Sequence, residues 1–193
     1  EIILVDDGST KDDTPAICDR YQAEYPDIVR AIHQENGGHG EAVNTGLKNA
    51  TGIFFKVVDS DDWVNEEAFQ EVLETLRRFV YGEETLDMLV TNFVYEKQGA
   101  KRKKVMKYNT AFPKEKVFGW DDVKFFMTGQ YILMHSVIYR TGLLRQCGLE
   151  LPKAYILCGQ HFRVPAIASC ETYLLSGCEF LPVFYRKTGP VRE

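Results

Sequence analysis

The sequence predicts an α/β fold in which a mostly parallel sheet is flanked by helices. Strand-like apolar runs alternate with helical patterns over residues 1–80, which is the order expected of βαβ units. Each of these runs ends in a turn rich in Asp, Asn or Gly. With 193 residues, of which 45% are hydrophobic and 26% charged, the chain is long enough for one substantial core.

The first four elements follow in order. A strand over 1–5 precedes a helix over 14–25, which opens with Thr-Pro, a pair typical of a helix start. A second strand over 28–34 ends in a glycine-rich turn, and a helix over about 41–50 follows, closed by a nearby Gly. This succession predicts two βα units with parallel strands.

The third strand-like run, over 53–58, is followed directly by the most informative turn. Asp59, Asp61 and Asp62 place three carboxylates within four residues, just before a helix predicted over 65–80. Desolvating three like charges costs several kcal/mol unless a cation lies beside them. Mg²⁺ in proteins takes one or two carboxylates together with substrate phosphates, so the turn predicts a metal site.

A structural explanation accounts for only part of this turn. The helix needs one N-cap, which Asp62 or Asn65 can supply alone, and acidic residues also favour the first turn of a helix. One capping residue leaves the other two carboxylates unexplained. The metal site therefore remains the preferred interpretation.

Beyond residue 80 the pattern changes to shorter elements. The basic cluster over 101–104 is interpreted as a solvated hairpin tip, with contact to an anionic acceptor or a membrane surface as the functional alternative. Trp120, Phe125 and Phe126 are interpreted as core residues. The elements predicted here are strands over 86–95, 103–108 and 131–139, and short helices over 120–127 and 141–147, the latter closed by Gly148.

Composition excludes several classes of function. The net charge of −5, without a broad basic stripe, argues against nucleic-acid binding. No apolar run is long enough for a transmembrane helix, and the opening residues do not resemble a signal peptide. The five cysteines show neither CxxC pairs nor zinc spacing, which predicts free thiols and a cytoplasmic location.

The turns after the strands suggest a nucleotide ligand. In open α/β sheets, ligands bind outside the carboxyl ends of the strands, where Asp6 and Asp7, the loop over 36–40 and the turn over 59–62 are expected. Carboxylates can accept hydrogen bonds from a base or a ribose, and glycines let the backbone approach a diphosphate. Neither a Walker loop nor GxGxxG is present, so ATPases and dinucleotide dehydrogenases are disfavoured.

Five segments, in this order and spacing, resemble family 2 glycosyltransferases of the GT-A fold. They are 3–10 (ILVDDGST), 36–38 (NGG), 44–47 (NTGL), 50–52 (ATG) and 58–63 (VDSDDW). The resemblance extends from residue 1 to about Lys153. It implies a Rossmann-like sheet with a small acceptor-side region of hairpin and helix. It also divides the chain into a nucleotide-sugar-binding part (1–110), an acceptor-side part (111–153) and an atypical tail (154–193).

The resemblance also implies a site and a reaction. Asp7, with Asp6, would contact the nucleoside, and a DxD pair would touch the ribose and an Mn²⁺ or Mg²⁺ ion on the diphosphate. A sugar would pass from a nucleotide-diphosphate sugar, expected to be a UDP-sugar, to a hydroxyl of a carbohydrate or lipid-linked acceptor, with inversion. The implied nucleotide-sugar contacts are Asp6, Asp7, Asn36, Gly37, Asn44, Asp59 and Asp61. The implied metal ligands are Asp59 and Asp61, which form the DxD pair, with Asp62 as an alternative ligand if the acidic cluster is aligned one residue later.

Such enzymes build cell-surface polysaccharide at the cytoplasmic face of the membrane, which implies peripheral membrane association. A non-catalytic module that binds nucleotide sugar or metal, and an incomplete fragment, are the rival interpretations.

The chain departs from the family pattern at both ends. The family begins with a further βα unit, so we expect a truncated start. The general base is expected after Pro152, yet no Asp follows Asp122, and the tail offers only Glu171, Glu179 and Glu193. Codons can be chosen for the tail so that the next reading frame encodes a family-like segment, which suggests a frameshift after Lys153. We therefore expect weak or no transfer activity from this chain.

Overall fold

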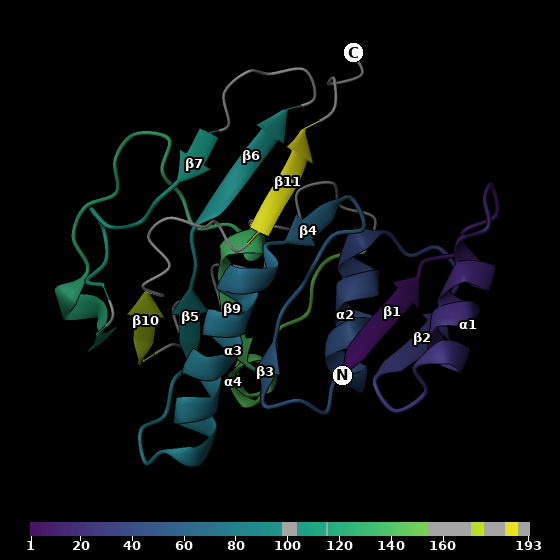
Figure 1. Ribbon diagram of the computed structural model, residues 1–193, viewed down its shortest axis with the longest axis horizontal. Coiled ribbons are helices and arrows are strands. Elements are labelled where there is room, and N and C mark those ends of the chain that lie inside the picture. Colours follow the sequence, from purple (N-terminus) through teal and green to yellow (C-terminus); the bar gives the residue numbers. More distant parts are fainter. Residues whose placement is uncertain (98–103, 115, 154–170, 176–183, 189–193) are drawn as a thin grey trace. The chain divides into compact units, whose positions relative to one another are not determined.

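The computed structural model describes residues 1–97, 104–114, 116–153, 171–175 and 184–188 (Figure 1). Most of the predicted tail, and with it the frameshift hypothesis, lies outside the described residues. Contacts between Cα atoms divide the chain into two compact units. The first comprises Glu1–Phe55 and Thr141–Ala168, and the second Lys56–Arg140 and Ser169–Glu193. The three parts predicted above were defined by role, so their boundaries remain a prediction.

The first unit opens with the two predicted βα pairs. Strand β1 (Ile2–Asp6) pairs in parallel with β2 (Val29–His33), with the last residues of the two strands opposite each other. Helix α1 (Thr14–Glu24) packs against both strands, and α2 (His39–Asn49) packs against β1 (Figure 1). All four elements confirm the prediction to within two residues. The loops that follow β1 and β2 therefore leave the same edge of this sheet.

Helix α4 (Thr141–Gln146) joins the first unit from much later in the chain. The hydroxyl of Thr141 donates a hydrogen bond to the carbonyl oxygen of Gly52 at 2.6 Å. The guanidinium of Arg145 donates to the carbonyl oxygen of Ala50, the C-cap of α2, also at 2.6 Å. These contacts hold α4 beside the end of α2, and the predicted helix is confirmed.

The third predicted strand is shorter than its apolar run. Only Phe54–Phe55 is extended as β3, and residues 56–58 lie outside any strand. The helix after the acidic turn is α3 (Glu66–Tyr81). The side chain of Asn65 accepts a hydrogen bond from the backbone N–H of Ala68 at 2.9 Å, so Asn65 is the N-cap. Asp62 is thus not needed for capping.

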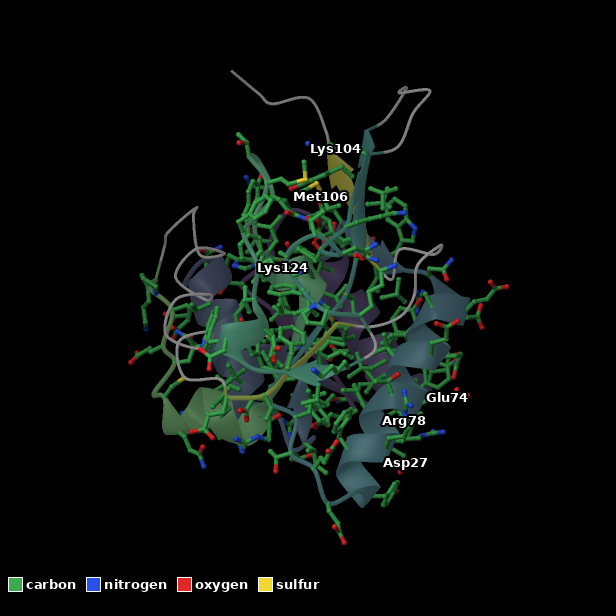
Figure 2. All side chains as sticks on the ribbon, turned by 90° about the vertical axis from the view of Figure 1, so that its left-hand side faces the viewer. Asp27, Glu74, Arg78, Lys104, Met106 and Lys124 are labelled. Carbon is green, nitrogen blue, oxygen red and sulfur yellow. The ribbon has the colours of Figure 1, made fainter. Side chains whose placement is uncertain are left out.

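Helix α3 buries one face and exposes the other. Its buried residues recur at helical spacing, which is the pattern of an amphipathic helix. Glu74 and Arg78, one turn apart, are exposed (Figure 2). The buried residues are Ala68, Val72, Thr75 and Leu76.

Short strands make up the rest of the second unit. One run of paired strands has the order β9-β5-β10-β8, with β5 and β10 parallel and the other pairs antiparallel. A four-stranded sheet has the order β4-β11-β6-β7, and β6 with β7 forms the predicted hairpin. The bounds are β4 (Asp62–Val64), β5 (Met88–Val90), β6 (Phe93–Lys97), β7 (Lys104–Met106), β8 (Val117–Phe118), β9 (Val137–Arg140), β10 (Tyr173–Leu175) and β11 (Phe184–Thr188).

An ion pair between buried Asp87 and partly exposed Arg140 supports the β9-β5-β10 arrangement. The Asp87 carboxylate, beside β5, accepts two hydrogen bonds from the Arg140 guanidinium, at 2.7 and 3.0 Å. It also accepts from the backbone N–H groups of Glu171 and Thr172, just before β10. This carboxylate, only 4% exposed, therefore joins three strands of the second unit.

The predicted helix over 120–127 is wrong beyond its first turn. Only Trp120–Asp122 is helical, as a 3-10 turn, because the backbone N–H of Lys124 donates to the carbonyl oxygen of Ala111 instead of to its own helix. Trp120, Phe125 and Phe126 are 46%, 77% and 37% exposed, so their assignment to the core is also wrong. Similarly, the strand predicted over 131–139 begins only at β9, after a 3-10 turn.

Within the described residues, no helix combines the length and the apolar character that crossing a bilayer requires.

Candidate functional site

The carboxylate of Asp6, at the end of β1, is occupied by contacts within the first unit. Its residue is 4% exposed, and Oδ1 accepts a hydrogen bond from the backbone N–H of Ser9 at 3.0 Å. Oδ2 lies 2.9 Å from Nδ1 of His33, whose Nε2 lies 3.1 Å from a carboxylate oxygen of Asp19 on α1. The hydrogen bond with His33 lowers the pKa of Asp6, and the same bond raises the pKa of His33. Asp6 thus ties β1, β2 and α1 together.

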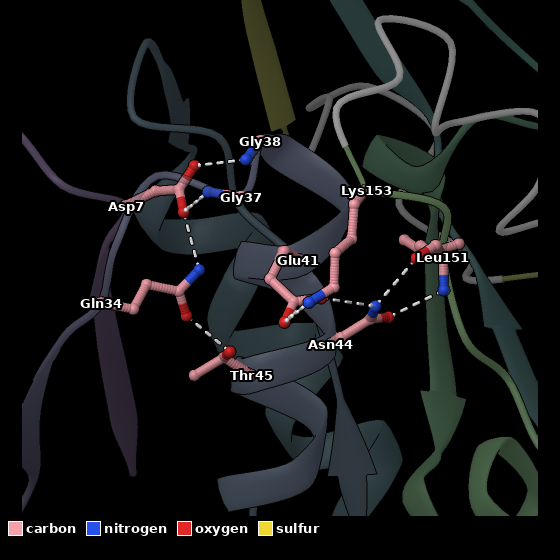
Figure 3. Close-up of polar contacts among 9 residues, drawn as sticks. All are labelled: Asp7, Gln34, Gly37, Gly38, Glu41, Asn44, Thr45, Leu151 and Lys153. Carbon is pink, nitrogen blue, oxygen red and sulfur yellow. Dashed lines mark hydrogen bonds and ion pairs between the residues drawn. The ribbon is translucent and has the colours of Figure 1, made fainter.

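Asp7 turns its carboxylate toward the loop that follows β2 (Figure 3). Oδ1 accepts from the side-chain amide of Gln34 at 2.7 Å and from the N–H of Gly37 at 2.9 Å. Oδ2 accepts from the N–H of Gly38 at 2.8 Å. Gln34 in turn accepts a hydrogen bond from the hydroxyl of Thr45 on α2, at 2.6 Å. One carboxylate therefore organises the start of α2 and the loop before it.

Two glycines leave room for close contacts around this network. Gly8 has a φ of +74°, and a Cβ there would lie 2.8 Å from the backbone nitrogen of Asn36, so a larger residue would push the two loops apart. A Cβ on Gly37 would lie 2.7 Å from the side chain of Glu41 on α2, so a larger residue there would displace that side chain. The side chain of Asn36 remains exposed at this position.

Asn44, on α2, faces a segment that is distant in sequence. Its amide nitrogen donates to the carbonyl oxygen of Leu151 at 2.9 Å, and its amide oxygen accepts from the N–H of Leu151 at 2.8 Å. One turn earlier on the helix, Glu41 forms an ion pair with Lys153 at 3.0 Å. The contact with Lys153 lowers the pKa of Glu41. Sequence reasoning assigned Asn44 to the nucleotide site and gave no sign of its pairing with Leu151.

The acidic turn belongs to the second unit. Asp61 is exposed, whereas Asp59 and Asp62 are partly buried, and the N–H of Asp62 donates to the carbonyl oxygen of Asp59 at 3.0 Å. Just before the turn, the Lys56 ammonium donates to the carbonyl oxygen of Met134 at 2.9 Å. Desolvation lowers the pKa of Lys56 to about 7, against the opposing attraction of Asp59 and Asp62. The turn thus already has a cationic group beside it.

The carboxylates of this turn suit a cation whose other ligands come from a substrate or from water. Among the described residues, no three His, Cys, Asp or Glu side chains are grouped so that they could hold a metal ion. A divalent cation bound here would take one or two of the carboxylates and fill its shell with phosphate oxygens and water, as Mg²⁺ commonly does. Asp61 is the most accessible of the three predicted ligands.

The structure therefore brings together some of the predicted residues. Asp7 and Gly37 are joined in one hydrogen-bond network, with Asp6 next to it and Asn36 in the same loop. Asn44 lies on the helix that starts at this network. Asp59, Asp61 and Asp62 form their own turn in the other unit. Sequence reasoning missed His33, Gln34 and Lys56, whose chemistry depends on neighbours distant in the chain.

The fold is that of the GT-A class. Residues 1–349 of TarS from S. aureus superpose with a TM-score of 0.70 at 21% identity, covering 97% of this chain and 51% of that one. The same TarS fragment in complex with UDP gives a TM-score of 0.68 at 21% identity, covering 98% of this chain and 52% of that one. The same fragment in complex with UDP-GlcNAc gives a TM-score of 0.64 at 20% identity, covering 100% of this chain and 50% of that one. These likenesses confirm the predicted α/β fold.

The sequence places the chain within a family. The model of glycosyl transferase family 2 matches residues 1–142, and the chain belongs to this family. Glycosyltransferase GlyG of Streptococcus pneumoniae is 44% identical over 94 residues, which are 48% of this chain and 29% of that protein. The minor teichoic acid biosynthesis protein GgaB of Bacillus subtilis is 40% identical over 73 residues, 38% of this chain and 8% of that protein. The chain thus spans less than a third of either relative.

Proposed function

We propose that the first unit of this chain binds the nucleoside of a nucleotide-sugar donor at the turn formed by Asp6 and Asp7. The observation that carries this proposal is the Asp7 network, in which one carboxylate gathers Gln34 and the N–H groups of Gly37 and Gly38. A carboxylate in this position retains lone pairs that can accept from a base N–H or a ribose hydroxyl. The TarS complexes with UDP and UDP-GlcNAc support a uridine nucleotide as the donor.

The acidic turn of the second unit would bind the cation of the donor complex. Asp61, with Asp59 or Asp62, would hold Mn²⁺ or Mg²⁺ through carboxylate oxygens, and the diphosphate would supply further ligands. When bound, the ion would stabilise the negative charge that develops on the leaving diphosphate. The chain's own contribution is to place these carboxylates at the start of α3, whose cap is Asn65.

The reaction we propose is transfer of a sugar, with inversion, from a UDP-sugar to a hydroxyl of a carbohydrate or lipid-linked acceptor. The relative GgaB, by its name a teichoic acid biosynthesis protein, supports an acceptor of the cell-surface polymer type. A cytoplasmic location at the inner face of the membrane is part of this proposal. The free thiols of Cys18 and Cys147 support the reducing compartment.

Calorimetric titration with UDP, in the presence and absence of Mn²⁺, tests the binding step. Asp61→Ala should weaken UDP binding in Mn²⁺ by about tenfold, since a ligand to the cation contributes about 1.4 kcal/mol or more. Asp121→Ala removes another exposed carboxylate, from the 3-10 turn of the same unit, and should change the affinity by less than about twofold. Binding in Mn²⁺ that survives Asp61→Ala unchanged would reject the metal assignment.

A module that binds the donor without transferring its sugar is the competing function. Both functions require the Asp7 network, so binding alone does not separate them. Release of UDP from UDP-GlcNAc in the presence of a polymer acceptor would identify a transferase. UDP-GlcNAc binding with no release of UDP, in this chain and in a longer relative alike, would favour the binding module.

A further inference from the structure

Helix α2 makes polar contacts toward two separate segments of the first unit (Figure 3). At its start, the N–H of Gly38 is held by Asp7, and farther along, Thr45 is linked to the same carboxylate through Gln34. Asn44 instead faces the segment after α4, where it meets Leu151. Neighbouring residues of one helix therefore hold the loop after β2 and a segment more than a hundred residues away.

The contact between Asn44 and Leu151 is bidentate and engages both polar groups of the Leu151 backbone. The side-chain amide donates to the one carbonyl oxygen and accepts from the one N–H of Leu151, as a neighbouring strand would. Leu151 is only 2% exposed, so water cannot readily replace these partners. The amide nitrogen also lies 3.4 Å from Oε2 of Glu41, so a nucleotide that accepted from Asn44 would compete with Leu151 or Glu41.

A second contact supports the same segment. Lys153 pairs with Glu41 at 3.0 Å, and Glu41 lies one helical turn before Asn44. The Lys153 side chain is 70% exposed, so this ion pair contributes little by itself. The bidentate amide contact is therefore the principal polar attachment between α2 and this segment.

We propose that Asn44 is a positioning residue that fixes the backbone of Leu151 on α2, and that it does not contact the donor. We call this pairing of the Asn44 side-chain amide with the Leu151 backbone the clamp. The clamp follows from the contacts above, whereas its consequence for sugar transfer rests on the proposed function. Under that function, α2 carries the loop that receives the nucleoside and also holds the segment around Leu151. Asn44 would thus fix that segment relative to the donor loop within the first unit.

Hydrogen exchange of the Leu151 amide, measured by NMR on this chain, tests the clamp. In the parent this amide should exchange at least about tenfold more slowly than an unstructured one, since its hydrogen must leave Asn44 before exchange. Asn44→Ala, which keeps a strong helix former, should speed exchange at Leu151 about tenfold or more while the β1 amides keep their rates. Asn49→Ala, the same substitution on the same helix, should leave Leu151 unchanged, because Asn49 donates to Thr45.

UDP calorimetry on the same variants separates the two roles of Asn44. The clamp predicts that Asn44→Ala binds UDP within about twofold of the parent, whereas a donor contact predicts a loss of about tenfold or more. If Asn44→Ala leaves the exchange rate of the Leu151 amide unchanged, the proposal is overturned. It is also overturned if the Leu151 amide of the parent exchanges as fast as an unstructured amide, a result that can be obtained without any variant. If the parent does not bind UDP, the proposed function fails, and the exchange rates still decide the clamp.

Discussion

The two acidic turns of this chain are built in opposite ways. In the first, Asp6 and Asp7 accept hydrogen bonds from backbone and side-chain donors of their own unit. In the second, the nearby Lys56 ammonium offers a positive charge to Asp59 and Asp62, while Asp61 extends into solvent. The first turn is thus organised by hydrogen bonds within its own unit, whereas the second combines a nearby lysine with one carboxylate that is exposed to solvent.

This difference shows that neighbouring acidic residues in a sequence can have different structural roles. A carboxylate that receives several N–H donors is stabilised by the local backbone and shapes the loop that it holds. Carboxylates crowded in one turn repel each other, and a nearby cation lowers that repulsion. Under the proposed function, the first arrangement would receive the nucleoside, and the second would hold a metal ion on the diphosphate.

Asp7→Asn should have the largest effect on this comparison. The variant removes the charge that holds three donors and turns an NH₂ group toward at least one of them. We expect the free energy of unfolding to fall by about 2–3 kcal/mol, because charge-assisted hydrogen bonds contribute about 1.5–3 kcal/mol. Urea denaturation measures the change. Asp12→Asn is the control and should cost less than about 0.5 kcal/mol, because this exposed carboxylate accepts from the neighbouring backbone N–H of Thr14.

Lys56→Met should change how stability depends on pH. The folded-state pKa of Lys56, about 7, lies below the unfolded value near 10.5, so between these values the unfolded chain binds more protons. Stability from this group therefore rises with pH, by about 2 kcal/mol from pH 7 to pH 9. Urea midpoints of the parent and the variant should converge or cross over this interval. A constant difference between them would show that Lys56 does not titrate there.

His33→Gln should have a smaller effect, confined to acidic pH. The pKa of His33 is raised, so the stabilisation from its charged form is complete below the unfolded value near 6.5 and is lost as pH rises through the folded value. The pKa of Asp6 is lowered, so the Asp6–His33 pair weakens again when the pH falls through the folded-state pKa of Asp6. Thermal melts should differ most between these limits and least at pH 8.5. An equal difference at pH 5 and pH 8.5 would contradict the charged pair.

Local patterns predicted much of the fold. The helices α1, α2, α3 and α4 follow from apolar spacing and from caps such as Asn65, which act within a few residues. The region after residue 120 could not be predicted in this way. There, Lys124 pairs with Ala111 and Phe126 packs on Phe112, and both partners lie in a separate segment. Tertiary contacts decided the structure where local propensity was weak.

The candidate site was predictable to a similar degree. The motif identified Asp7 and the glycine loop, because short spacing carries both the carboxylate and the backbone it needs. It did not reveal that the amide of Asn44 is paired with Leu151, since that partner lies 107 residues away. Nor did the sequence show the buried surroundings of Lys56, which arise from the carbonyl oxygen of Met134 and from packing. The identity of a side chain thus makes it a candidate for the site, whereas the group that it contacts in the fold indicates what it does there.

Calorimetry that compares uridine with UDP, each with and without Mn²⁺, tests most directly whether the two turns have the separate roles proposed for them. If the first turn binds the nucleoside and the second a metal on the diphosphate, uridine should bind with an affinity that Mn²⁺ changes by less than about twofold. UDP should gain about tenfold or more from Mn²⁺, and Asp61→Ala should remove that gain. Uridine binding that requires Mn²⁺, or UDP binding that gains nothing from it, would contradict this account.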